Sequence, residues 1–151
     1  MSMPRKVAVI GAGEIGVGWA ALCASAGWPV AMFDMNPRTT ERAFTEVPRR
    51  ARALVALDRA TQGMVERGLL EFTQARSLLQ AVKDADWVVE AIAEDAIAKQ
   101  KLFESIELVA SPDALLTSSS SSLPPHDIFS RCRRLDRCLV APPLNPPELI
   151  P

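Results

Sequence analysis

The chain has 151 residues and a mass of 16.4 kDa, which suits one compact domain with a sizeable core. Hydrophobic residues make up 48% and charged residues 23%, a balance that excludes a disordered chain. The formal net charge of −1 indicates neither nucleic acid nor an anionic membrane as a partner. The apolar stretch 7–33 is interrupted by glycines and Glu14, so it does not predict a membrane span. Cys23, Cys132 and Cys138 have no metal-ligand spacing and fit free thiols in a reducing cytoplasm.

In chain order, a β-branched run over 6–10 predicts a buried parallel strand. Small and apolar residues at helical spacing predict a helix over 14–26, and a second buried strand is expected at 29–33. A long helical region rich in Ala, Leu and Arg follows over 38–67. Pro48 should kink or divide this region, because proline removes a helix hydrogen bond.

The alternation continues beyond Gly68. The pattern predicts strands and helices over two sets of ranges: strands at 70–73, 87–90, 115–117 and 138–141, and helices at 77–82, 97–109 and 124–130. The prolines of 142–147 then exclude both a helix and a central strand. Strands that alternate with helices predict an α/β fold with a doubly wound, mainly parallel sheet and helices on both faces.

A glycine-rich turn joins the first predicted strand to the first predicted helix and has the sequence Gly11-Ala12-Gly13-Glu14-Ile15-Gly16. Asp34 ends the second strand, 21 residues after Gly13. A Rossmann fingerprint has this arrangement, with an acid about 20 residues beyond the glycines. The first glycine permits the tight turn, the second lets a pyrophosphate approach the backbone, and the third lets the helix pack closely on the sheet. The helix N-terminus offers unpaired N–H groups to the phosphates.

Asp34 can accept hydrogen bonds from the adenosine ribose hydroxyls and would repel a 2′-phosphate, so the sequence predicts NAD rather than NADP. Arg38, four residues further on, is the one nearby group that could neutralise such a phosphate, but it more simply begins the next helix. A Rossmann-like domain that binds no dinucleotide is the alternative interpretation. The combined strand, turn, helix and acid favour NAD binding, and no pattern indicates a metal site.

Further segments of the chain resemble the NAD-binding N-terminal domain of the 3-hydroxyacyl-CoA dehydrogenase family, and most of all its hydroxy-acid branch, which includes L-gulonate 3-dehydrogenase (lambda-crystallin) and carnitine 3-dehydrogenase. The resemblance covers nearly the whole chain. It is carried by the run Val7-Ala8-Val9-Ile10 with the glycine turn, by Asp84-Ala85-Asp86-Trp87-Val88-Val89-Glu90-Ala91-Ile92-Ala93-Glu94-Asp95, by Lys99, Lys101, Leu102 and Phe103, by the serine run 118–122 and by Leu144-Asn145-Pro146-Pro147.

The resemblance implies an oxidoreductase of fatty acid metabolism that transfers hydride between NAD and a small-molecule substrate, a 3-hydroxyacyl-CoA or a 3-hydroxy acid. It implies that Glu94 and Lys99 lie beside the nicotinamide ribose. It also implies that Ser121 hydrogen-bonds the substrate oxygen, with Ser120 and Ser122 left open because the serine register is uncertain by one residue. Association into a homo-oligomer is left open.

The chain departs from the family at its catalytic base. The family's histidine would stand at position 142, where this chain has Pro142, which has no titratable group. The single histidine, His126, begins the helix after the serines and is more simply an exposed polar residue. The chain also stops at Pro151, before the family's histidine-orienting glutamate and helical C-terminal domain, so we expect an incomplete domain over 1–151.

Three hypotheses about function follow from the sequence. The first is the cofactor domain of an active dehydrogenase, and the second is a catalytically inactive NAD-binding module or truncated relative. Pro142 favours the second for this chain in isolation. A weaker third hypothesis is an interaction protein whose uncovered sheet edge pairs with another copy.

Overall fold

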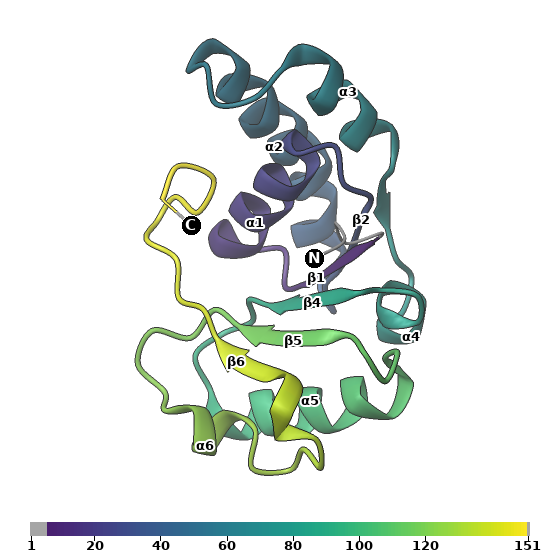
Figure 1. Cartoon of the computed structure of the whole chain (residues 1–151), viewed down its shortest axis with the longest axis vertical. Coiled ribbons are helices and arrows are strands. Elements are labelled where there is room, and N and C mark those ends of the chain that lie inside the picture. The colour runs from purple at the N-terminus through teal and green to yellow at the C-terminus, as the bar shows by residue number, and fades with distance from the viewer. Residues whose placement is uncertain (1–5, 151) are drawn as a thin grey trace.

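The structure is a computed structural model that describes residues 6–150. Its core is a parallel sheet in the strand order β3-β2-β1-β4-β5-β6 (Figure 1). The strands are β1 (Val7–Ile10), β2 (Val30–Phe33), β3 (Phe72–Gln74), β4 (Trp87–Glu90), β5 (Leu115–Ser118) and β6 (Cys138–Val140). The helices are α1 (Glu14–Ser25), α2 (Pro37–Ala56), α3 (Gln62–Leu70), α4 (Leu78–Val82), α5 (Ala96–Val109) and α6 (Pro125–Ile128), with a 3₁₀ turn η1 (Leu135–Arg137). The predicted Rossmann-type α/β fold is therefore confirmed.

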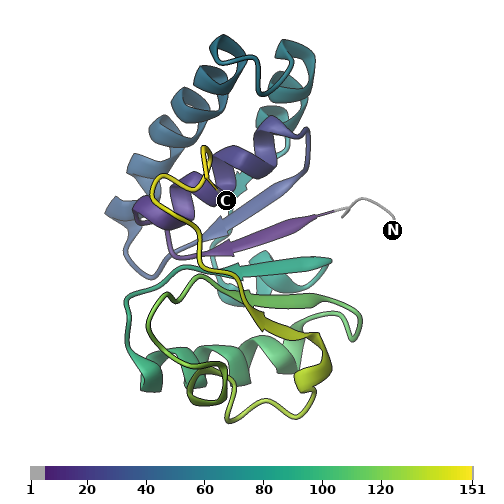
Figure 2. The ribbon, with the colours of Figure 1, turned by 60° about the vertical axis from the view of Figure 1, so that its left-hand side comes forward.

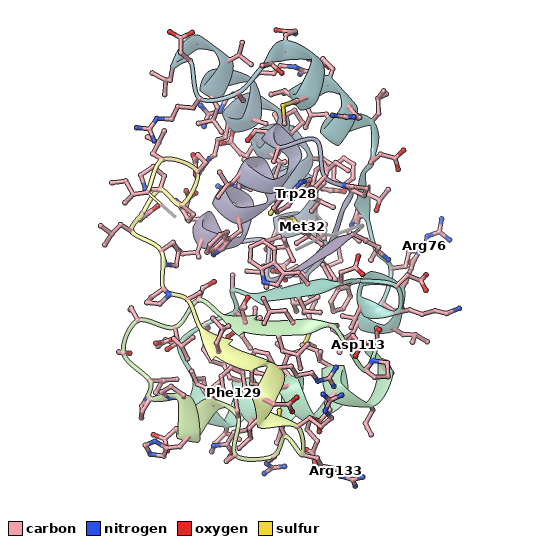
Figure 3. The ribbon with its side chains drawn as sticks, viewed as in Figure 1. Trp28, Met32, Arg76, Asp113, Phe129 and Arg133 are labelled. Carbon is pink, nitrogen blue, oxygen red and sulfur yellow. The ribbon has the colours of Figure 1, made fainter. Side chains whose placement is uncertain are left out.

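Helices cover both faces of the sheet. Figures 1 and 2 show α1, α2 and α3 on one side and α4, α5 and α6 on the other. Alternate strand residues serve the two layers: Val7 and Val9 of β1 pack toward α1 and α2, and Ala8 and Ile10 pack toward α4 and α5. Figure 3 shows the same division, with Met32 in the first layer and Phe129 in the second. Because both faces are buried, the strands read as continuous apolar runs rather than alternating ones.

The predicted break in the long helical region was wrong in its position. Pro48 lies inside α2, which continues without a break to Ala56. The division falls at 57–61, where Asp58 has a positive φ of 55° and the Thr61 hydroxyl caps α3 by accepting a hydrogen bond from the Met64 amide. The left-handed Asp58 and the threonine cap end one helix and start the next, so they override the proline signal.

The predicted strand over 70–73 was also misplaced. Leu70 is the last residue of α3 and its side chain is largely exposed, and the strand β3 begins only at Phe72. Phe72 is buried and stacks on Phe44 of α2 at a ring-centroid distance of 4.9 Å. A short edge strand of this kind is set by one packed aromatic residue rather than by a periodic pattern.

The proline-rich segment after β6 forms neither helix nor strand, as predicted. Figure 2 shows it running back from the sheet across α1. It is held there by the Arg59 guanidinium, which donates to the Leu149 carbonyl oxygen at 3.1 Å, and by an ion pair of 3.5 Å between Arg50 and the buried Glu148. Within residues 6–150, no helix has the length and apolarity needed to cross a membrane.

Candidate cofactor and substrate site

The glycine-rich turn lies between β1 and α1, at the carboxyl edge of the sheet. Gly11 has a positive φ of 102°, and a Cβ there would lie 2.4 Å from the Ala91 carbonyl oxygen. A Cβ on Gly16 would lie 1.8 Å from the Gly11 carbonyl oxygen, so only glycine allows α1 to pack this closely. A Cβ on Gly13, by contrast, would meet open space. Gly13 also begins α1 without a side-chain cap, which leaves the first N–H groups of the helix available to an anion.

Asp34 follows β2 and faces the glycine turn. Its carboxylate accepts one hydrogen bond from the Ala12 amide and one from the Asn36 amide, both at 2.8 Å. These bonds fix the carboxylate beside the turn, and each oxygen keeps a further lone pair for a hydroxyl donor. Asp34 also lines a cavity of about 800 Å³ between the carboxyl ends of β1, β2 and β4. The cavity has mainly apolar walls, among them Phe33 and Leu102, which suit an adenine ring.

A smaller cavity of about 230 Å³ lies on the other side of the turn, at the carboxyl ends of β4 and β5. It brings together three residues that the sequence singled out, since Glu94, Lys99 and Ser121 all line it. The Lys99 ammonium lies 3.3 Å from Glu94 Oε2. Ile15 of the glycine turn forms part of the same wall, so the turn contributes to both cavities, as do Ala91 and Ile92 of the loop after β4.

The serine run is divided between structural and free hydroxyls. Ser118 donates to Glu90, Ser120 and Ser122 donate to Glu94, and Ser119 accepts from Trp19 Nε1 at 2.9 Å. Ser121 is exposed, and its hydroxyl makes no hydrogen bond with any of residues 6–150. Among the three serines left open by the sequence, Ser121 is the one that lines the smaller cavity and whose hydroxyl has no hydrogen-bond partner among residues 6–150.

Glu90 is a site residue that the sequence analysis missed. It ends β4, is 0% exposed, and accepts hydrogen bonds from Lys99 Nζ at 2.6 Å, from the Ile92 amide at 2.7 Å and from the Ser118 hydroxyl. Lys99 is itself only 1% exposed. The available signal was an acid closing an otherwise apolar buried strand, because such a charge is not buried without partners.

Glu94 is tuned toward its ionised form. Partial burial acts to raise its pKa, but hydrogen bonds from Ser120 and Ser122 and the charge of Lys99 outweigh this effect and lower the pKa to about 2. Glu94 is thus a fixed negative charge at the rim of the smaller cavity near neutral pH.

Position 142 and His126 lie in different surroundings. Pro142 follows β6 at the same edge of the sheet, next to Ala141, whose amide donates to the Ser118 carbonyl oxygen at 2.9 Å. His126 is on α6 with its side chain 81% exposed, and its Nε2 lies 3.3 Å from Asp127 Oδ1. His126 does not line the cavity that holds Ser121, in agreement with its interpretation as an exposed polar residue.

The arrangement fits a dinucleotide. Two cavities adjoin a turn in which Gly11 and Gly16 leave no room for a side chain, an acid lies beside the larger cavity, and charged and hydroxyl groups line the smaller one. These features define a dinucleotide-binding domain of the Rossmann type. A family model described as "3-hydroxyacyl-CoA dehydrogenase, NAD binding domain" matches residues 6–151. The chain therefore belongs to the 3-hydroxyacyl-CoA dehydrogenase family as its NAD-binding domain, and its cofactor is NAD.

Curated relatives agree with this assignment. The chain is 37% identical over 152 residues to the lambda-crystallin homolog of Bos taurus, covering 99% of this chain and 47% of that protein. It is 40% identical over 152 residues to the L-carnitine dehydrogenase/betainyl-CoA thioesterase of Rhizobium meliloti (strain 1021), covering 100% of this chain and 30% of that protein. The chain thus spans less than half the length of these relatives.

Solved structures share the fold. The 3-hydroxybutyryl-CoA dehydrogenase of Escherichia coli K12 superposes with a TM-score of 0.85 at 30% identity, over 96% of this chain and 30% of that one. An NAD⁺-dependent 5-formyl-3-hydroxy-2-methylpyridine 4-carboxylic acid 5-dehydrogenase gives a TM-score of 0.88 at 28% identity, over 99% of this chain and 47% of that one.

Proposed function

We propose that this chain holds NAD for the interconversion of a 3-hydroxy group and a 3-keto group, on an acyl-CoA or a free hydroxy acid. One observation carries the proposal: the glycine turn lines two cavities, a larger one bordered by Asp34 and a smaller one bordered by Glu94, Lys99 and Ser121. When bound, NAD supplies a hydride acceptor at the nicotinamide ring. The two cavities match the two halves of such a cofactor, with the pyrophosphate at the glycine turn.

Each site residue has a role in the proposal. Asp34 accepts hydrogen bonds from the adenosine ribose hydroxyls, while Glu94 and Lys99 contact the ribose at the nicotinamide end. Ser121 orients the substrate oxygen, because a hydroxyl can accept from the alcohol and donate to the ketone. Its freedom from other hydrogen bonds within residues 6–150 supports this role.

A second candidate function is an NAD-binding module that does not catalyse. Oxidation of a secondary alcohol releases a proton from its hydroxyl, and a group near neutral pKa should accept this proton. Pro142 cannot accept it, and the exposed His126 lies on a different element from the cavity. We infer that hydride transfer by this chain is slow unless another base reaches the substrate.

The substrate class comes from the relatives. One is named for 3-hydroxybutyryl-CoA and another for L-carnitine, so both a CoA thioester and a free acid are within the proposal. A role in fatty acid metabolism and a cytoplasmic location belong to the same proposal, and the three free cysteines support a reducing compartment. The proposal also includes a homo-oligomer, whose subunit contacts could involve the part of the relatives that extends beyond this chain.

Calorimetric titration tests the cofactor and the base separately. NAD and NADH should bind the chain more tightly than NADP, and Asp34→Asn should weaken NAD binding by roughly 1.5–3 kcal/mol, the value of hydrogen bonds to a charged group. Asp58→Asn, at the turn between α2 and α3, is the matched control and should leave affinity unchanged. Undetectable binding of both NAD and NADH would sink the proposal.

Turnover of NADH with 3-keto substrates then distinguishes the two functions. It is measured in the longest polypeptide that the gene encodes, with Pro142→His beside the unmodified protein. Activity that rises with the histidine supports a dehydrogenase site that lacks its base. Equal and substantial activity without the histidine would show that a different group donates the proton to the keto oxygen in this direction.

A further inference from the structure

A cluster of three charged side chains, two of them buried, lies at the smaller cavity. Lys99 Nζ is 2.6 Å from Glu90 Oε1 and 3.3 Å from Glu94 Oε2, so one ammonium group serves two carboxylates. Glu90 and Lys99 are 0% and 1% exposed, and the side chain of Glu94 is 38% exposed at the rim. We call Glu90, Lys99 and Glu94 the triad.

The triad has two carboxylates and one ammonium group, so its formal net charge is −1. Each of these groups has specific partners. Glu90 is stabilised by Lys99, by the Ile92 amide at 2.7 Å and by the Ser118 hydroxyl. Glu94 is stabilised by Lys99 and by the hydroxyls of Ser120 and Ser122. The hydrogen bonds and the charge of Lys99 lower the pKa of Glu94 to about 2, so its carboxylate is ionised near neutral pH.

The cavity above the triad corresponds to the nicotinamide end of the cofactor in the proposed function. Asp34 marks the adenosine end, and the cavity lined by Lys99, Glu94 and Ser121 lies across the glycine turn from it. The oxidised nicotinamide ring has one positive charge and the reduced ring has none. A fixed negative charge in a partly dehydrated site therefore interacts differently with the two forms.

We propose that the triad biases this site toward the oxidised cofactor, and that Glu90 is a positioning residue that holds the Lys99 ammonium and contributes half of the negative charge. The inference rests on the proposed function, because it requires the nicotinamide end in the smaller cavity. Glu90 does not line that cavity and acts through Lys99. Glu90 therefore changes the ratio of the affinities for NAD⁺ and NADH, in addition to any effect that is equal for both.

The test compares three ligands by calorimetry: NAD⁺, NADH and ADP-ribose, which lacks nicotinamide. Glu94→Gln and Glu90→Gln each remove one negative charge from the triad with little change in shape. Each should raise the affinity for NADH relative to NAD⁺ by about three- to tenfold, the range expected of one charge in a partly screened site. ADP-ribose keeps the ribose that Glu94 contacts and lacks the ring, so any fall in its affinity in Glu94→Gln measures the lost ribose contact apart from the effect of the ring charge.

Two further variants separate charge from structure. Glu90→Asp keeps the charge but shortens the reach to Lys99, so its NADH-to-NAD⁺ affinity ratio should stay near wild type even if both affinities fall. Glu104→Gln removes an exposed charge from the same helix, α5, where Glu104 pairs with Arg131, and should leave the ratio unchanged. If Glu90→Gln fails to fold, as loss of a buried ion-pair partner allows, Glu94→Gln alone still decides the charge effect.

The outcomes are distinguishable from failure of the proposed function. If wild type binds none of the three ligands, the proposed function fails and the inference fails with it. If wild type binds ADP-ribose and both cofactors but the ratio is unmoved in Glu94→Gln and Glu90→Gln, only the inference is overturned. A ratio that moves equally in Glu90→Asp and Glu90→Gln would assign Glu90 a purely structural role.

Discussion

Two glycines of the cofactor turn are required for different reasons, and mutation should separate them. Gly16→Ala places a Cβ 1.8 Å from the Gly11 carbonyl oxygen, which is backbone and cannot move away cheaply. The loss of stability should lie at or above the top of the roughly 1–3 kcal/mol range of overpacked cores. Gly13→Ala meets open space and should cost less than about 1 kcal/mol at this N-cap position.

Gly13→Ala, which should change stability little, should have a large effect on NAD binding. The Gly13→Ala protein should fold but bind NAD at least about tenfold more weakly, because a methyl group fills the approach of the pyrophosphate to the helix N-terminus. Urea denaturation and calorimetry on the same samples measure the two effects. A Gly13→Ala protein that binds NAD normally would show that the pyrophosphate does not lie at this turn.

Glu94 makes stability depend on acid pH. Its folded-state pKa is lowered from 4.5 to about 2, so the ionised carboxylate stabilises the folded state at any pH above the unfolded-state value. This contribution is lost as the pH falls from about 4.5 to about 2. Glu94→Gln should therefore be less stable than wild type at pH 7, with a difference that shrinks across that window.

Urea midpoints measured for both proteins at a series of pH values check this dependence. The difference should be modest, because the side chain is 38% exposed and solvent screens its pairing with Lys99. Glu71→Gln, on an exposed residue outside the site, is the control and should track wild type throughout. A gap between wild type and Glu94→Gln that widens on acidification would contradict the assignment of Glu94 as a depressed acid.

At the scale of elements, local patterns predicted most of the fold. The strand predicted at 87–90 has the same bounds as β4, because the polar residues on both sides of this apolar run mark where the strand begins and ends. The helix predicted at 97–109 differs from α5 by one residue, since its apolar spacing is regular. The break after α2 was missed because it depends on the left-handed Asp58 and the Thr61 cap, and aspartate and threonine are common in uninterrupted segments too.

Pro48 is an interior helix residue whose cost should be measurable. It cannot donate to the Phe44 carbonyl one turn earlier, so Pro48→Ala restores a hydrogen bond and removes a steric clash. We expect a gain of roughly 1–3 kcal/mol in the free energy of unfolding, reduced by the greater freedom of the unfolded chain.

Pro37 is the matched control because it is the first residue of the same helix. No intrahelical hydrogen bond is missing there, and the Asn36 side chain already caps the helix by accepting from the Arg38 amide at 3.1 Å. Pro37→Ala should therefore lower stability by about 0.4–1 kcal/mol through the unfolded state alone. Urea denaturation of both variants gives the comparison. Destabilisation by Pro48→Ala would mean that α2 needs the bend that a proline produces.

At the scale of the whole molecule, the site was predictable only where it is local in sequence. The glycine turn and Asp34 follow a short motif, and the structure joins them through the hydrogen bond from Ala12. Two side-chain partners of Glu90, Lys99 of α5 and Ser118 of β5, lie 9 and 28 residues along the chain, and no spacing rule connects them with Glu90. The free hydroxyl of Ser121 likewise became distinct from its neighbours only when their partners on β4, α1 and the loop after β4 were known.

The two halves of the sheet meet at the cofactor site, so NAD should stabilise both. Trp19 of α1 already links them by donating to Ser119 at 2.9 Å. With the cofactor at a hundred times its dissociation constant, the free energy of unfolding should rise by about 2.7 kcal/mol, because only the folded state binds it. ADP, which lacks both the nicotinamide and its ribose, should give the same increment at a hundred times its own dissociation constant.

Hydrogen exchange distinguishes the two ligands, because the increment in global stability does not. ADP should slow exchange of amides in the glycine turn and around Asp34, which border the larger cavity. NAD should slow these and also the amides of the loops after β4 and β5, where Ile92 and Ser121 border the smaller cavity. The Asp34→Asn protein, titrated to equal saturation, should show the same map and so controls for affinity. Protection by NAD that never extends beyond the ADP pattern would place the nicotinamide end in solvent, and the residues around Lys99 would then have no contact with the cofactor.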